Sequence, residues 1–307
     1  MNFLEAMSVE SFTSLGKKIY DMSNPREVRR CAVFIARSWL NYGRMKKIDA
    51  FYQQSKLRQN LSEIYPFVYE QPQRAFFYNK STFTERMRLI QEHFTFLEQT
   101  IKPEVLLDIY RENDQILWEN EHEGELLRLV VYYEPGQRKE GLLSVILRLG
   151  EKPLYQMIFW IQKNPQGEWA AYIGAMQGPN MDNAKDVIKK ITKQCHAYRT
   201  KNLILHATQE VVRDLGIKHL YAVTNYGYYA NNHVRMDRKL KTDFSRFWQE
   251  SGGKSCEDGR FYELPLVEYR KNMDEIPTRK RAVYRRRFAL LDEIDQSIAG
   301  AIKVLSR

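Results

Sequence analysis

The N-terminal third of the chain has the apolar spacing of helices. In residues 10–60, apolar side chains recur at mixed three- and four-residue intervals between faces rich in lysine and arginine, which predicts amphipathic helices. The positions are Val33, Phe34, Trp39, Leu40, Ile48 and Phe51. Such a stripe can pack on the protein's own core, which the sequence favours, or lie on a membrane surface between basic residues. Residues 84–110 return to helical spacing, and Pro103 is expected to open a new helix.

After residue 110 the pattern changes to short apolar or alternating runs. These runs cover residues 116–118, 126–133, 142–149, 154–161 and 169–175. Turn-forming residues such as Pro135-Gly136 and the Asn164–Gly167 segment separate several of them. Parallel strands need a long crossover, so these short connections predict an antiparallel β-meander.

The remaining chain alternates between helical and strand patterns. The expected elements are helices at 182–196 and 201–215, a strand at 217–225, a helix at 235–250, a strand at 261–266 and a long helix capped by Thr278. This order predicts an α+β fold whose central sheet is mixed but largely antiparallel and is flanked by helices. We expect an N-terminal helical region (1–110) and a mixed α/β domain (111–307) that ends in the long helix.

Composition indicates a globular protein, because 43% of the 307 residues are hydrophobic and 13% are aromatic. The three cysteines form no CxxC pair and no Cys/His cluster, so neither a metal site nor a disulfide framework is expected. Acidic and polar residues interrupt the N-terminal segment, and no apolar run approaches the roughly 20 residues that span a bilayer. A cytoplasmic location is therefore expected.

Positive charge is concentrated in two segments. Residues 17–58 carry eleven Lys/Arg against three Asp/Glu, and residues 270–287 carry eight against two. Residues 101–127 are acidic, with eight Asp/Glu against two Lys/Arg. This asymmetry favours an anionic partner, such as a phosphate-bearing small molecule, an anionic lipid or a nucleic acid. The alternative is that the positive charge maintains solubility and binds no specific partner.

One candidate site is the segment IGAMQGPNMD (173–182), where glycines surround the end of a strand just before a helix. Glycine permits close approach of backbone to a ligand, and a helix N-terminus attracts anions. We therefore expect Gln177, Gly178 and Asn180 to bind phosphate. An ordinary turn has the same sequence pattern.

A second candidate site follows the strand that ends at Asn225. Its Tyr- and Asn-rich loop leads to His233 and Arg235. A histidine in such a loop can act as a general base near neutral pH, and the arginine can neutralise an anion. A solvated basic helix with a capping asparagine is the alternative. In a third segment, RKRAVYRRR (279–287), arginines alternate with apolar residues, but the helix continues into an apolar face, so nucleic acid is the less favoured partner.

Several segments together resemble the VirK/YbjX family of Gram-negative bacteria over about residues 20–305. They are GAMQGP (174–179), the 199–203 junction, AVTN (222–225), His233, FW (247–248) with Gly252-Gly253, FYELP (261–265) and EIPTRKRAVYRRRFALLD (275–292). The resemblance implies a link to virulence, to the cell envelope and to resistance against antimicrobial peptides.

The element order is also similar to that of the GNAT acyltransferases, in which the loop after the central strand holds the pyrophosphate of acyl-CoA. Here Gln177-Gly178-Pro179-Asn180 stands in place of the usual loop motif. The similarity implies an acyltransferase that uses acyl-CoA or acyl carrier protein. Segment 177–183 with Arg199 and Lys201 would then hold the donor's phosphates. His233 would accept the acceptor's proton, and Asn225 would orient the carbonyl group. The alternative is a regulator or adaptor whose basic surface binds anionic lipid, RNA or protein.

Overall fold

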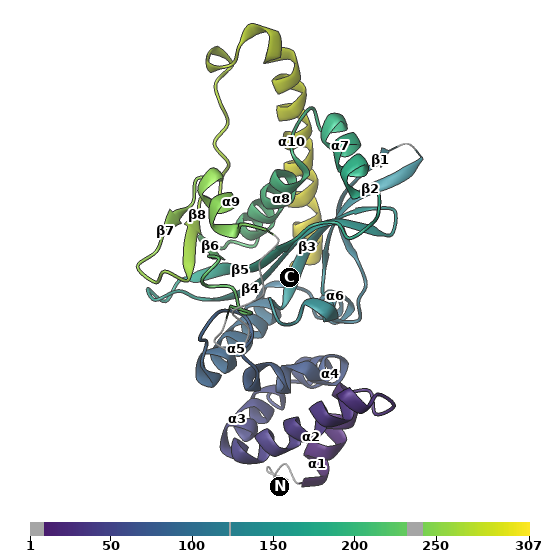
Figure 1. Ribbon diagram of the computed structural model, residues 1–307, viewed down its shortest axis with the longest axis vertical. Helices are drawn as coiled ribbons and strands as arrows, with labels where there is room; N and C mark the ends of the chain where they lie inside the picture. The colour runs from purple at the N-terminus through teal and green to yellow at the C-terminus, as the bar shows by residue number, and fades with distance from the viewer. Residues whose placement is uncertain (1–8, 123, 232–241) are drawn as a thin grey trace.

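One eight-stranded sheet organises the chain, in the part that the structure describes. The computed structural model describes residues 9–122, 124–231 and 242–307. The strands follow the order β1-β2-β3-β4-β5-β6-β8-β7 across the sheet (Figure 1). They are β1 (Gln115–His122), β2 (Glu125–Tyr132), β3 (Leu143–Leu149), β4 (Lys152–Lys163), β5 (Trp169–Gln177), β6 (His219–Val223), β7 (Lys254–Ser255) and β8 (Phe261–Leu264).

The first five strands form the predicted antiparallel meander, each pairing with the next. Tight turns join β1 to β2, β3 to β4 and β4 to β5, where Gly124, Gly150 and Gly167 adopt the positive φ angles (82°, 54° and 83°) that such turns require. A longer connection joins β2 to β3. Strand β1 is longer than the predicted run 116–118, because its second half is polar and pairs along the acidic hairpin. The α+β prediction with a mixed, largely antiparallel sheet is confirmed.

Strands β5 and β6 form the parallel pair of the sheet. Helices α7 (Ala184–Gln194) and α8 (Thr200–Asp214) make the crossover between them, as predicted. The pairing of β5 with β6 ends at Ile173 and Ala222, whereas β5 stays paired with β4 as far as Gln177. The carboxyl ends of β5 and β6 therefore separate.

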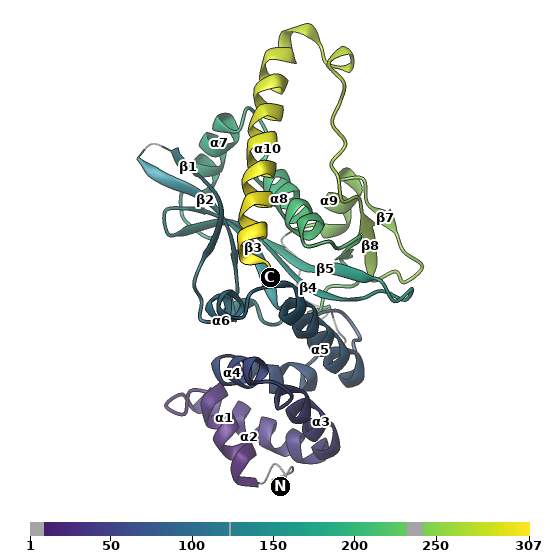
Figure 2. The same ribbon diagram turned by 180° about the vertical axis from the view of Figure 1, so that it is seen from behind.

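Helices cover both faces of the sheet. On one face lie α8 and the long α10 (Thr278–Leu305), and on the other lies the N-terminal helical part of the chain (Figures 1 and 2). The remaining helices are α1 (Val9–Ile19), α2 (Pro25–Leu40), α3 (Tyr42–Tyr52), α4 (Lys56–Ile64), α5 (Phe83–Thr100), α6 (Pro103–Tyr110), α9 (Phe244–Glu250) and the 3-10 turns η1 (Pro66–Tyr69), η2 (Gln71–Gln73), η3 (Pro135–Gln137) and η4 (Met273–Glu275).

Helix ends follow the predicted signals with one exception. Pro103 opens α6, with Lys102 outside it, as expected. Thr278 does not cap α10: it is the first helical residue, and Pro277 occupies the capping position without a side-chain hydrogen bond. Among the described helices, none has both the length and the apolar character needed to cross a bilayer.

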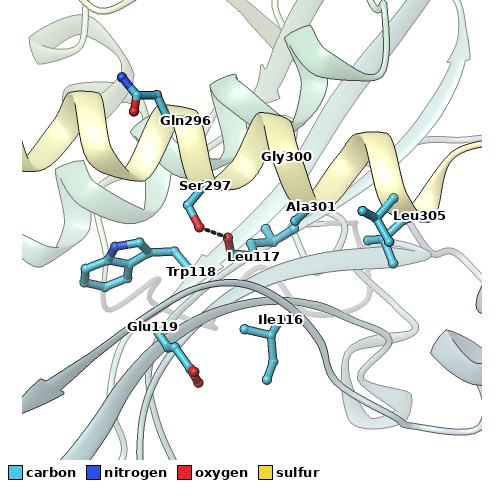
Figure 3. Close-up of a pocket in the computed structure, with 10 residues that line it drawn as sticks. Ile116, Leu117, Trp118, Glu119, Gln296, Ser297, Gly300, Ala301 and Leu305 are labelled. Atoms are coloured by element: carbon cyan, nitrogen blue, oxygen red, sulfur yellow. Dashed lines mark hydrogen bonds between the residues drawn. The ribbon is translucent and has the colours of Figure 1, made fainter.

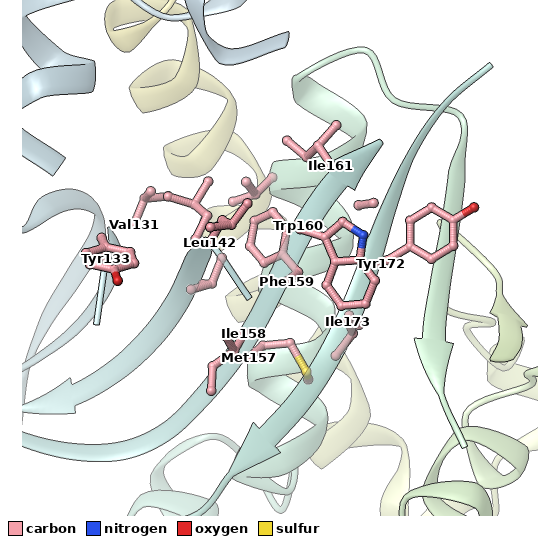
Figure 4. Close-up of a cluster of buried hydrophobic side chains, with 14 of the residues drawn as sticks. Val131, Tyr133, Leu142, Met157, Ile158, Phe159, Trp160, Ile161, Tyr172 and Ile173 are labelled. Atoms are coloured by element: carbon pink, nitrogen blue, oxygen red, sulfur yellow. The ribbon is translucent and has the colours of Figure 1, made fainter. Parts of the chain in front are cut away.

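The core is thickest around β4, whose residues from Met157 to Ile161 are buried on both faces of the sheet (Figure 4). This burial explains why the strand is a continuous apolar run in the sequence rather than an alternating one. The ring of Trp160 stacks on those of Tyr78 and Tyr172, with centroids 6.0 Å and 5.6 Å away.

Helix α5 is held on β4 by a buried histidine. The Ile161 backbone N–H donates to His93 Nδ1 at 3.1 Å, and His93 Nε2 lies 3.1 Å from the Tyr110 hydroxyl. Because Nδ1 accepts, Nε2 must carry the proton and donate to Tyr110, so the ring is neutral. The Tyr110 hydroxyl in turn donates to the Leu142 carbonyl oxygen at 2.7 Å.

A short segment of the N-terminal part fits against the separated ends of β5 and β6. The Phe77 N–H donates to the Lys139 carbonyl oxygen at 2.7 Å, and the Asn79 N–H donates to the Gly227 carbonyl oxygen at 2.8 Å. Tyr78, between them, forms a β-bridge with Tyr228. The division at residue 110 stays a prediction, and these contacts cross it.

Candidate functional site

A buried carboxylate lies between the loops that follow the separated strands β5 and β6. Glu140 is 4% exposed and belongs to the connection between β2 and β3. The Tyr228 hydroxyl, from the loop after β6, donates to Glu140 Oε1 at 2.5 Å. Gln177 Nε2, at the end of β5, donates to Glu140 Oε2 at 2.7 Å. The two strand ends that the sequence singled out therefore meet at one acidic side chain.

Two glycines allow the backbones around this site to approach closely. A Cβ atom at Gly174 would lie 1.8 Å from the Glu140 carbonyl oxygen, and one at Gly227 would lie 2.0 Å from the Arg260 carbonyl oxygen. Gly174 was expected to make room for a ligand. In the structure, the backbone of Glu140 occupies the space next to Gly174 instead.

Burial makes the ionised form of Glu140 less favourable than it is in water. Burial raises the pKa of the Glu140 carboxyl group, although the hydrogen bonds from Tyr228 and Gln177 oppose this shift. Burial and the neighbouring carboxylate also raise the pKa of Tyr228. Tyr228 and Gln177 are half-buried, so the pair adjoins solvent on their side. A carboxyl group of raised pKa joined to a tyrosine hydroxyl can accept and pass on a proton.

The predicted phosphate-binding residues border this site through Tyr155. A Cβ atom at Gly178 would lie 3.4 Å from Tyr155 Cε1. Burial raises the pKa of the Tyr155 hydroxyl, and the nearby side chain of Thr200, the first residue of α8, opposes this shift. No side chain caps the N-terminus of α8, where backbone N–H groups need acceptors. Gln177, Gly178 and the start of α8 are thus brought together.

The other predicted phosphate ligands lie at the edge of this region. Arg199 precedes α8 and is exposed, and Asn180 is exposed in the loop after β5. The Lys201 ammonium lies 3.7 Å from Glu250 and 4.5 Å from the centre of the Phe247 ring, which directs it toward α9.

Asn225 fastens the end of β6 to the start of α9. Its Oδ1 accepts from the Phe244 and Ser245 N–H groups at 2.8 Å and 3.3 Å, and its Nδ2 donates to Asp243 Oδ1 at 2.8 Å. The amide is thus hydrogen-bonded within the chain, and Asp243, rather than an asparagine, is the N-cap residue of α9. His233 and Arg235, together with residues 235–241 of the predicted helix 235–250, lie outside the described residues, and their roles stay predictions.

The arginine-rich start of α10 divides into two groups. Arg285 and Arg286 are exposed, as expected for a solvated helix face. Arg287 is half-buried, and its guanidinium group donates to the His196 carbonyl oxygen at 3.0 Å while lying 4.3 Å from the centre of the Tyr284 ring. Arg287 therefore joins α10 to the turn between α7 and α8.

His206 is the centre of a buried polar contact between α8 and α10, with its Nε2 2.6 Å from Asp295 Oδ1. Ligand atoms of His206, Glu210 and Asp295 lie within 4.8 Å of one another, which makes this the cluster best suited to a metal ion within the described ranges. However, Arg213 pairs with Glu210, and Arg270 lies 3.0 Å from Asp295. Because arginines already neutralise both carboxylates, we assign the cluster to helix packing.

Two cavities lie along α10, and Trp118 lines both of them. One, of 390 Å³, lies between β1 and α10, where Ser297 Oγ donates to the Leu117 carbonyl oxygen at 2.7 Å and mostly apolar side chains line the walls (Figure 3). The other, of 440 Å³, includes Trp118, His196 and Arg286. Neither Glu140 nor Tyr228 lines either cavity.

The sequence interpretation missed Glu140 and Tyr228. Tyr228 lies in the loop that the sequence analysis identified as a candidate site. The catalytic roles were predicted for its neighbours His233 and Asn225 instead. Glu140 follows a polar run and precedes Gly141, so a solvated turn was the natural interpretation. The close approach to Gly174 is the only signal, and it requires the tertiary structure.

Comparison with known proteins places the chain in a family. The profile described as "Protein of unknown function (DUF535)" matches residues 23–300. An uncharacterized protein of Haemophilus influenzae is 27% identical over 267 residues, which is 85% of each chain. The uncharacterized protein YbjX of Escherichia coli is 31% identical over 179 residues, which covers 57% of this chain and 54% of YbjX.

A third relative, named membrane protein LapB, comes from Mannheimia haemolytica. It is 24% identical over 191 residues, which covers 61% of this chain and 79% of that protein. No solved structure gives a significant match. The resemblance to YbjX that the sequence motifs predicted is confirmed, and the chain belongs to the DUF535 family of VirK/YbjX-type proteins.

Proposed function

We propose that this protein transfers an acyl group from a phosphate-bearing thioester donor, acyl-CoA or acyl carrier protein, to an amine or hydroxyl acceptor. The observation that carries the proposal is the buried Glu140–Tyr228 pair between the separated ends of β5 and β6. Separated ends of parallel strands are a common place for ligands in α/β sheets. The order of strands and crossover helices also agrees with the GNAT similarity noted in the sequence.

The donor's phosphates would bind at the loop after β5 and the N-terminus of α8. Backbone N–H groups at the start of α8 lack a side-chain cap, and Arg199 and Lys201 add positive charge beside them. Gly178 presents backbone without a side chain next to Tyr155. The thioester would then extend from this anion-binding region toward Tyr228.

The proposed reaction uses Glu140 as the general base. The acceptor's nitrogen or oxygen attacks the thioester carbonyl carbon and loses its proton to the Glu140 carboxylate. The new acyl bond forms as the carbon–sulfur bond breaks, and the thiolate that leaves is protonated by the Tyr228 hydroxyl. Tyr228 recovers its proton from Glu140 through their 2.5 Å hydrogen bond, so protons and electrons balance.

The biological setting is part of the proposal. The name of the relative LapB supports an acceptor at the membrane. We therefore propose an envelope component as acceptor, modified from the cytoplasmic side, with a contribution to virulence and to resistance against antimicrobial peptides.

Donor binding is tested by thermal unfolding with and without acyl-CoA. A ligand at a concentration of about 100 times its Kd adds roughly 2.7 kcal/mol of stability, so the Tm should rise by several degrees. Arg199→Gln should reduce this rise. Lys189→Gln, the same loss of charge at an exposed position of α7, should not.

Catalysis is tested by release of free thiol from acyl-CoA in the presence of amine or hydroxyl acceptors. Glu140→Gln should keep the donor-dependent rise in Tm and lose thiol release by about 100-fold or more, because general-base catalysis typically contributes 10²–10⁴-fold. If neither acyl-CoA nor acyl carrier protein changes the Tm at saturating concentration, the proposal is wrong.

A further inference from the structure

Helix α2 exposes an unusual number of large apolar side chains. On this helix Val28 is 38% exposed, Val33 40%, Trp39 41% and Leu40 86%. Met22, shortly before the helix, is 43% exposed. Isolated surface apolar residues are ordinary, but a concentration of them on one element marks an interaction site.

Val33 and Leu40 lie on the outward side of α2, away from the core, whereas Val28 and Trp39 lie beside its buried side. The inward side is made by Cys31, Phe34 and Ser38, which are buried. Val33 and Leu40 are seven residues apart, about two helical turns, so they project from the same side of the helix. The apolar stripe predicted from the sequence therefore divides, and only part of it packs on the core.

Neighbouring rings hold Trp39 in place while leaving part of it in solvent. Its ring meets the edge of Phe12 at 5.6 Å and stacks on Tyr42 at 5.8 Å, measured between centroids. An exposed tryptophan with this support loses little conformational freedom when it enters an interface.

Arginines lie among the apolar side chains of the same outward side. Helix α2 carries four arginines and one glutamate. Arg30 pairs with Glu27, whereas no ion pair is recorded for Arg26 or Arg29 within the described residues. Arg26 and Arg29 lie seven and four residues before Val33, so they flank its side of the helix.

We infer that the outward side of α2 binds the surface of an anionic lipid bilayer. Lipid phosphates would pair with Arg26 and Arg29, while Val33 and Leu40 would enter the boundary between headgroups and acyl chains, with Trp39 at the edge of the contact. Exposed aliphatic side chains offer nothing to a nucleic acid backbone, which favours the bilayer over RNA. Helix α2 lies in the helical end of the molecule, with the sheet at a distance (Figures 1 and 2), so the sheet does not cover this surface.

The experiment is sedimentation of the full chain with vesicles. Phosphatidylcholine vesicles that contain about 30% phosphatidylglycerol should bind the protein, and pure phosphatidylcholine vesicles should not. Arg26→Gln with Arg29→Gln should weaken binding roughly 30-fold and reduce its salt dependence, since each arginine near an anionic surface contributes about 1 kcal/mol. Val33→Ser with Leu40→Ser should weaken binding by a similar factor through loss of apolar burial, about 1 kcal/mol for each partly inserted side chain.

Matched variants elsewhere separate α2 from the rest of the surface. Val267 and Val304 are 59% and 67% exposed and lie far from α2 in the sequence, so Val267→Ser with Val304→Ser should bind vesicles normally. Glu140→Gln should also bind normally, because this inference does not depend on the transfer site. Circular dichroism and Tm should show that every variant is folded.

Three outcomes would overturn the inference. The first is failure of the folded wild-type chain to bind anionic vesicles. The second is an equal loss of binding in the α2 variants and in the matched variants. The third is undiminished vesicle binding by the Val33→Ser, Leu40→Ser variant, which would show a purely electrostatic association that nucleic acid could equally provide.

Discussion

The backbone at Gly174 lies so close to Glu140 that a Cβ atom at residue 174 would be 1.8 Å from the Glu140 carbonyl oxygen. That oxygen belongs to backbone and cannot move aside cheaply. Gly174→Ala should therefore cost about 3 kcal/mol or more of unfolding free energy, at or above the upper end of overpacking effects. Urea unfolding would measure the loss.

Gly300 provides the control for Gly174. It lies in the interior of α10, and a Cβ atom there would meet nothing within 4 Å. Gly300→Ala should stabilise the protein by about 0.5–1 kcal/mol, because alanine favours the helix. A Gly174→Ala protein as stable as wild type would show that the approach to Glu140 is not tight in solution.

The raised pKa of Glu140 predicts how stability depends on pH. The folded state holds this proton more tightly than the unfolded state, whose carboxyl pKa is near the ordinary 4.5. Stability should therefore fall as pH rises from below 4.5 through the folded pKa, and should then become constant. Glu140→Gln should lack this fall, so its stability relative to wild type should increase over the same pH window. Urea unfolding at several pH values would reveal it, and a pH-independent difference would contradict it.

His93 predicts the opposite pH dependence. Burial lowers the pKa of His93 from 6.5 to about 3, and its Nδ1 accepts a backbone hydrogen bond. Since the folded state holds the neutral ring, its contribution is complete above pH 6.5 and is lost as pH falls toward 3. Between pH 7.5 and pH 5 the wild type should lose about 2 kcal/mol through this group.

His93→Gln isolates that contribution. A glutamine can accept from Ile161 and donate to Tyr110, so this variant should fold but should not show the loss between pH 7.5 and pH 5. Chemical unfolding of both proteins at the two pH values gives the comparison, and identical slopes would rule out a buried neutral His93.

Asn225 can be tested for a role beyond holding α9. Its Oδ1 accepts two backbone N–H groups at the start of α9, so Asn225→Ala should cost about 1–2 kcal/mol, as the loss of a helix cap does. Asn225→Asp would place a second carboxylate next to Asp243, which Asn225 Nδ2 contacts at 2.8 Å, so its loss of stability should shrink at acidic pH. If either folded variant also loses transfer activity more than 100-fold with unchanged donor binding, the predicted catalytic role holds.

The fold was predictable because its signals are local. Pro135-Gly136 and the Asn164–Gly167 turn separate runs of strand length, and Pro103 begins a helix, all as the residue types require. Strand β7 was missed since it is two residues long and depends on pairing with β8. The exposure of Val33 and Leu40 could not be predicted from the sequence either. The helical spacing puts apolar residues on two sides of α2, and it does not show which side packs on the core.

The sequence predicted where the candidate site lies in the fold, but it did not predict which side chains form the site. The segments after Ile173 and Val223 lie at the same edge of the sheet because adjacent parallel strands end there. The carboxyl group between them belongs to Glu140, in a third segment of the chain. The residues next to Glu140 in the sequence do not predict that it is buried. A charged residue becomes buried through partners such as Tyr228 and Gln177, which lie 88 and 37 residues away.

The segment around Tyr78 also has a consequence for biosynthesis. Its partners, Lys139 and Gly227, leave the ribosome about 60 and 150 residues later, which at 5–20 residues per second is a delay of roughly 3 to 30 seconds. During that time the aromatic side chains of this segment have no sheet to cover them. A nascent chain of this protein is therefore expected to need chaperone protection until the strand after α8 has been translated, and to fold slowly because its contacts join distant parts of the sequence.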